Sequence, residues 1–149
     1  MCILTKENVG ALPLVAEHDI PCYKLLRHMG HNGFGCLSRR RFSSVIRQFE
    51  WRLHKTYKEE SFPDILPYGV TSNGFYAWGE GEETYAFNKL EEYRPDLYTV
   101  VKCVIPKGSK YYMSDPDRRE HSDYPVHPIT YCAEQMKAVA YYRNGKWMS

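Results

Sequence analysis

Residues 100–112 constrain the fold of this chain more than any other part of its sequence. The segment begins with Val-Val-Lys-Cys-Val-Ile, a run rich in β-branched residues, and ends with the aromatic pair Tyr-Tyr. Both halves favour extended strands with at least one buried face. Between them Pro106 fixes φ and Gly108 can adopt a positive φ, so the chain can turn here. The pattern predicts two strands of one sheet joined by a Pro-Lys-Gly turn.

The first of these strands is expected to lie in the middle of the sheet. Strand alternation places residues 101, 103 and 105 on one face and residues 100, 102 and 104 on the other. Because both sets are mostly apolar, we expect both faces to be covered, one of them by a helix near residues 82–93. A new carboxylate on either face would then be buried without a partner. Both Cys103→Asp and Val104→Asp are therefore expected to unfold the protein.

The rest of the chain alternates between short apolar or aromatic runs and polar turns. This predicts one α+β domain over residues 1–149, with a mostly antiparallel sheet and one or two helices. Residues 1–18 are expected to be a peripheral lead-in. Residues 38–57 fit helix or strand, and a short helix near 39–47 followed by a strand near 48–57 is favoured. Other strands are predicted at 22–27, 74–78, 97–105, 109–113, 129–131 and 136–142, the well-defined helix at 82–93, and a polar tail after residue 142.

The charge and the cysteines exclude some classes of protein. Twenty basic and 18 acidic residues leave a net charge of +2, too balanced for a protein dedicated to duplex DNA. No apolar run approaches the length of a membrane span. The five cysteines form no CxxC pair, and the N-terminus becomes charged too soon for a signal peptide. We expect a cytoplasmic protein with reduced cysteines and no membrane association.

Aromatic and basic residues are the main candidates for ligand binding. Aromatic residues make up 15% of the chain, and an arginine-rich segment covers residues 39–52. Guanidinium groups bind phosphates and aromatic rings stack on bases, although a solvated basic face explains the same arginines. The predicted ligand-binding residues are Arg27, Arg40, Arg47, Trp51, Tyr76 and Trp78.

Two groups of histidines contain the residue types of reactive or metal sites. His28, His31 and Cys36 lack the four ligands in two close pairs that structural zinc prefers. His121 and His127 flank an aspartate in a polar segment without a nucleophile motif. A glycine-rich loop and a solvated loop explain these residues better. We therefore predict no metal site.

Four pieces of the sequence, in their order, resemble a family of small uncharacterised proteins from gut Bacteroidales and their phages. They are residues 1–4, 19–26, 74–75 and 101–112, and the likeness extends over roughly two thirds of the chain. The family's usual histidine in the aromatic strand is Tyr76 here. The resemblance implies a phage-encoded protein of the bacterial cytoplasm and supplies no activity.

A weaker resemblance is to ADP-ribosyltransferase-type domains. Arg27, Ser72 and Glu134 occur in the order of that family's arginine, hydroxyl and glutamate positions, with residues 105–108 as the turn. The resemblance implies that the arginine holds the pyrophosphate of NAD and the glutamate bonds the ribose. The chain departs from the family pattern at Cys132, where a glutamate or glutamine is usual.

These observations predict a non-enzymatic binding or interaction protein without a cofactor. Its partner would be a small anionic ligand of nucleotide type or a host protein. The suspected phage origin suggests that the protein sequesters a nucleotide signal of host immunity. The alternative is an ADP-ribosyltransferase-like enzyme that uses NAD through Arg27, Ser72 and Glu134.

Overall fold

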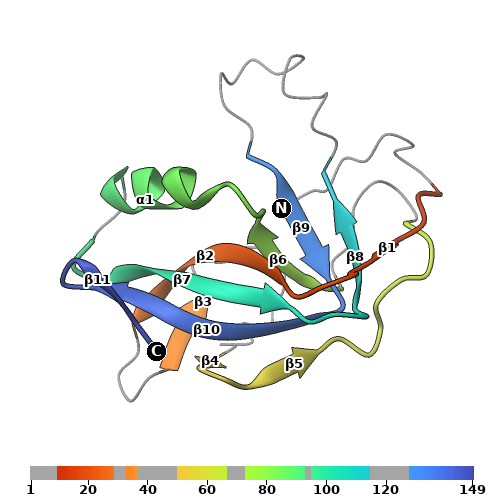
Figure 1. The fold of residues 1–149 in the computed structure, drawn as a ribbon, viewed down its shortest axis with the longest axis horizontal. Coiled ribbons are helices and arrows are strands. Elements are labelled where there is room, and N and C mark those ends of the chain that lie inside the picture. Colours follow the sequence, from red (N-terminus) through yellow and green to blue (C-terminus); the bar gives the residue numbers. More distant parts are fainter. Residues whose placement is uncertain (1–9, 29–32, 37–49, 67–72, 93–94, 115–127) are drawn as a thin grey trace, which may run out of the picture.

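The computed structural model describes residues 10–28, 33–36, 50–66, 73–92, 95–114 and 128–149 (Figure 1). The described residues form strands joined by short turns and one helix. In chain order the elements are β1 (Leu14–Val15), β2 (Ile20–His28), β3 (Gly33–Cys36), β4 (Glu50–Arg52), β5 (Thr56–Lys58), β6 (Phe75–Trp78), α1 (Glu83–Glu92), β7 (Tyr98–Ile105), β8 (Lys110–Met113), β9 (Thr130–Ala133), β10 (Gln135–Arg143) and β11 (Lys146–Met148).

The prediction of an α+β fold is wrong. Strands account for about half of the structure and α1 for only about a tenth, so the described part of the chain is a β fold with a single helix. The sequence underestimated the strands because several of them have only two to four residues and lie between polar turns. The expectation of a mostly antiparallel sheet is confirmed, since every strand pairing in the described residues is antiparallel. The helix predicted at 39–47 lies outside the described residues.

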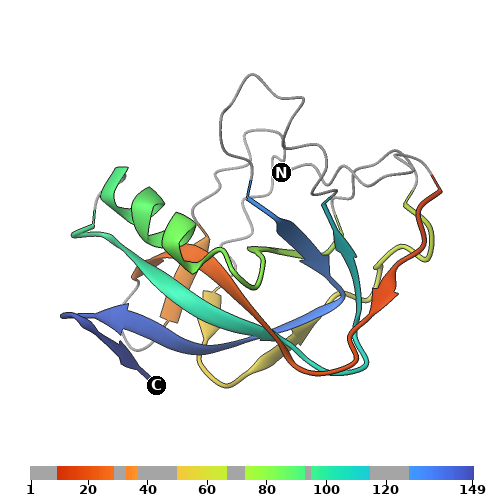
Figure 2. The same cartoon turned by 45° about the horizontal axis from the view of Figure 1, so that its top comes forward.

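The strands of the described residues form one branched sheet. Its main path is β1-β8-β9-β6-β2-β7-β10-β11, while β3 pairs with β2 and β4, and β5 pairs with β10. The longest ladder joins β2 to β7 over eight residue pairs, from Ile20 with Ile105 to Arg27 with Tyr98. In Figure 2, β8 and β9 run at a steep angle to the long strands β2, β7 and β10. The sheet therefore curves around its own interior.

The predicted assignment of residues to the two faces of β7 is confirmed, but only one of the faces is fully covered. Val101, Cys103 and Ile105 are fully buried in the main core, and Val100 lies on the opposite face with Ala86 of α1. Val104 is only half-buried. It lies opposite Pro21 near one end of the β2–β7 ladder, whereas α1 covers the other end. The helix therefore shields only part of the face to which Val104 belongs.

The Pro-Lys-Gly turn forms a corner of the sheet. It joins β7 to β8, but β7 pairs with β2 and β10 while β8 pairs with β1 and β9. Gly108 has a φ of 87°, and its N–H donates to the carbonyl of Ala16 at 2.8 Å. The N–H of Ala16 donates in turn to the carbonyl of Ser109 at 2.9 Å. The described part of the predicted lead-in is thus hydrogen-bonded into the fold, and Ala11 and Ala16 are buried.

A turn between two short strands and a short hairpin replace two predicted features. In place of one strand near 48–57, β4 and β5 are separated by a turn in which His54 has a φ of 66°. In place of a polar tail, β10 turns back into β11 at Asn144 and Gly145, with φ values of 51° and 80°. Two positive φ values in a two-residue loop define a type I′ hairpin turn.

The two faces of β7 predict unequal effects of a new charge. Cys103→Asp places a carboxylate among fully buried side chains, and we expect a loss of at least about 4 kcal/mol or failure to fold. Val104→Asp keeps partial access to water, and we expect a loss of about 1–2 kcal/mol rather than the unfolding predicted above. Urea denaturation of both variants measures the difference. Equal losses of stability in the two variants would contradict the difference in burial between Cys103 and Val104.

Candidate functional site

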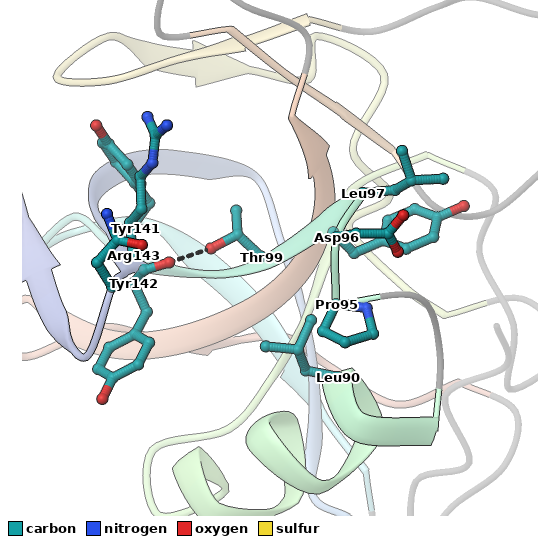
Figure 3. Close-up of a pocket in the computed structure, with 10 residues that line it drawn as sticks. Leu90, Pro95, Asp96, Leu97, Thr99, Tyr141, Tyr142 and Arg143 are labelled. Carbon is teal, nitrogen blue, oxygen red and sulfur yellow. Dashed lines mark hydrogen bonds between the residues drawn. The ribbon is translucent and has the colours of Figure 1, made fainter.

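A cleft of about 380 Å³ opens where β7 begins and β10 ends (Figure 3). It is lined by residues 95–99, which lead into and begin β7, by residues 141–144 at the end of β10, and by Leu90 from the last turn of α1. Three segments far apart in the sequence therefore supply its walls. The β2–β7–β10 pairing brings them together.

The cleft forms because the backbone pairing of β7 with β10 stops before the two strands end, and a side-chain hydrogen bond joins them beyond that point. In the described ladder the final residue pair is Val101 with Tyr141. Beyond it the hydroxyl of Thr99 donates a hydrogen bond to the carbonyl oxygen of Tyr142 at 2.6 Å. Thr99 is buried, so this bond holds the two strand ends in fixed positions without closing the space beside them.

Aromatic rings continue from the cleft across the face that α1 covers. The ring of Tyr142 lies 4.7 Å from that of Phe87 and 5.4 Å from that of Trp147, measured between centroids. Trp147 is 37% exposed and contacts Tyr23, whose hydroxyl donates to Glu83 at 3.3 Å. Burial, and then the carboxylate of Glu83, raise the pKa of Tyr23. This aromatic cluster holds α1 against the sheet and leaves Trp147 partly exposed to solvent.

Two guanidinium groups lie at this end of the sheet. Arg143 lines the cleft and is exposed, and its guanidinium group has no hydrogen bond or ion pair within the described residues. Arg27 is also exposed and also has no such partner there, and it stands opposite Tyr98 in the β2–β7 ladder. Figure 3 places Asp96 across the cleft from Arg143. The cleft thus combines positive charge, one carboxylate and tyrosine rings.

Three predicted ligand-binding aromatics have structural roles instead. Trp51 is only 2% exposed and packs in the main core against Tyr57 and Phe75. Tyr76 is buried in a second core cluster. Trp78 is half-buried, with its ring 5.2 Å from that of Tyr85 on α1. None of the three contributes to the lining of the cleft.

The residues of the ADP-ribosyltransferase reading are not brought together. Arg27 lies at one end of the β2–β7 ladder, whereas Glu134 accepts a hydrogen bond from the N–H of Lys110, just beyond the corner at the other end. Seven residue steps along a strand span about 23 Å. Ser72 lies outside the described residues, as do Arg40 and Arg47. Of the predicted site residues that the structure describes, Arg27 comes nearest to the cleft: it stands opposite the lining residue Tyr98 but does not itself line the cleft.

The described residues contain no group of three or more His, Cys, Asp and Glu side chains that could hold a metal ion. The side chains of His28, His31, Cys36, His121 and His127 lie outside the described part of the chain. Within that part, no helix has the length and apolar character needed to cross a membrane.

No family model, curated protein or solved structure matches this chain. The resemblances to proteins of Bacteroidales phages and to ADP-ribosyltransferase-type domains therefore stay predictions.

The hydrogen bond of Thr99 predicts a measurable effect on stability. Thr99→Val keeps the shape of the side chain but leaves the Tyr142 carbonyl without its donor, and we expect a loss of about 1 kcal/mol. Thr99→Ser retains the hydroxyl and is the matched control, with a smaller loss expected. Urea denaturation compares the two variants. A Thr99→Val protein as stable as the serine variant would show that this bond does not secure the strand ends.

Proposed function

We propose that this is a non-enzymatic binding protein that takes a small anionic ligand of nucleotide type in the cleft between β7, β10 and α1. One observation carries the proposal: tyrosine rings line the cleft beside Arg143, whose guanidinium group has no hydrogen bond or ion pair within the described residues. Stacking and charge neutralisation together are how proteins recognise nucleotides.

Each part of such a ligand has a counterpart among the lining residues. A planar base could lie against the tyrosine rings, an interaction worth about 1–3 kcal/mol per base. Phosphate oxygens could accept two parallel hydrogen bonds from the guanidinium group of Arg143. The carboxylate of Asp96 could accept a hydrogen bond from an amino group of the base. These contacts hold a ligand without changing it chemically.

The biological role follows from the sequence resemblance alone. A phage-encoded protein that binds a nucleotide in the bacterial cytoplasm would lower the free concentration of a host immune signal. The alternative partner, also compatible with the sequence, is a host protein.

Thermal shift measurements test the binding. Cyclic dinucleotides and ADP-ribose are added separately at up to millimolar concentration. We expect at least one to raise the melting temperature, because a ligand that binds only the folded state stabilises it by about 2.7 kcal/mol at one hundred times its Kd. No shift with any of these compounds would overturn the assignment of a nucleotide-type ligand.

Two variants locate the binding. Arg143→Ala removes a charge-assisted contact, and we expect titration calorimetry to show affinity about 10-fold to 100-fold weaker. Lys107→Ala is the matched control, since it removes the same charge from the exposed corner at the far end of β7. An equal loss in both variants would indicate nonspecific attraction rather than a site in the cleft.

A further inference from the structure

Two cysteines face each other across the central ladder of the sheet. Cys22 on β2 is paired in register with Cys103 on β7, and both are fully buried free thiols of the main core. Directly opposed residues of an antiparallel pair have Cα atoms about 4.5–5.5 Å apart. A disulfide needs a Cα separation of about 4.4–6.8 Å. The backbone therefore already holds these two residues at bonding range, with both side chains on the same face.

The surroundings of the pair allow its sulfur atoms to move together. Ala138 stands opposite Cys103 on β10, and its small side chain leaves more room than a larger residue would. Lys24 lies on the same face, two residues from Cys22, with its ammonium 5.2 Å from the centre of the Trp51 ring. Its amino group also donates to the carbonyl of Tyr76. A fixed positive charge thus stands near both thiols, where it favours the thiolate form.

Burial acts in the opposite direction and dominates. It raises the pKa of Cys103 to about 12, with Lys24 lowering that pKa by a smaller amount. It also raises the pKa of Cys22 well above its usual value, and the neighbouring Cys103 raises it further. Both thiols are therefore protonated at neutral pH. The closed fold protects them, and local opening sets the rate at which they react.

We propose that Cys22 and Cys103 form a redox site that closes into a cross-strand disulfide on reaction with a hydroperoxide. One thiolate attacks the peroxide, the O–O bond breaks, and the sulfur becomes a sulfenic acid while the released hydroxide takes the thiol proton as water. The second sulfur then displaces the hydroxyl group as another water. In total, two thiols and one hydrogen peroxide give one disulfide and two waters.

Peptide mapping tests this directly in the wild-type protein. Trypsin releases residues 7–24, which contain only Cys22, and residues 103–107, which contain only Cys103. After treatment with hydrogen peroxide in mild urea, we expect these peptides to be joined, with a mass about 2 Da below their sum. The yield should rise with pH above 8, as more thiolate forms. Oxidation of either cysteine to sulfinic acid, or its linkage to a different cysteine, without this joined peptide would overturn the proposal.

Stability provides a second readout. The disulfide would close a long loop between positions 22 and 103, so we expect the oxidised protein to melt at least about 5 °C higher, reversibly with dithiothreitol. Cys22→Ala should lose this shift, while Cys132→Ala, which lacks a cysteine opposite it in the sheet, should keep it. A shift retained in Cys22→Ala would contradict the assignment. If that variant does not fold, the peptide map of the wild type decides.

Discussion

The ladder between β2 and β7 is the constraint on which the rest of this structure depends. Its eight residue pairs give the long, regular backbone pairing to which β10 is added on one side and β6 and β3 on the other. One face of the ladder contributes Leu26, Val101 and Ile105 to the main core. Each such buried side chain contributes roughly 1.5–3 kcal/mol relative to exposure. The other face supplies Leu25 and Val100 to the cluster under α1.

The candidate site is a consequence of where this ladder and its neighbour end. Pairing of β2 with β7 continues to Arg27 and Tyr98, whereas pairing of β7 with β10 stops at Val101 and Tyr141. The mismatch leaves a space that neither strand fills, and the hydrogen bond from Thr99 to the carbonyl of Tyr142 holds the two strand ends together beside it. Because the walls are strand ends and a helix end, their side chains are held by the rigid part of the fold. A binding site with preorganised walls loses less entropy when its ligand binds.

Much of the local structure could be predicted from the sequence. The β-branched run of β7 and the amphipathic pattern of α1 are strong signals because each depends on neighbouring residues alone. The hairpin into β11 could also have been predicted, since Asn144-Gly145 is a typical type I′ turn. The fold class was missed because very short strands are stabilised by partners distant in the chain, which no local pattern reveals.

The candidate site was harder to predict for the same reason. Aromatic content predicted a binding surface but could not distinguish Trp51, which is buried in the core, from Trp147, which is partly exposed. The cleft depends on the register between β7 and β10, and the position of Arg27 opposite Tyr98 depends on the register between β2 and β7. Register is set by long-range pairing. Spacing along a single chain therefore could not predict that Cys22 and Cys103 lie opposite each other.

Native-state hydrogen exchange tests the central role of the β2–β7 ladder most directly. Residues 22–25 and 100–103 should contain the slowest amides, with an opening free energy equal to the free energy of unfolding from urea denaturation. Protection should fall toward Thr99 and Arg143, which lie beyond the last residue pair between β7 and β10. If the amides of β8 and β9 exchanged more slowly than those of β2 and β7, the ladder would not be the element that holds the fold together.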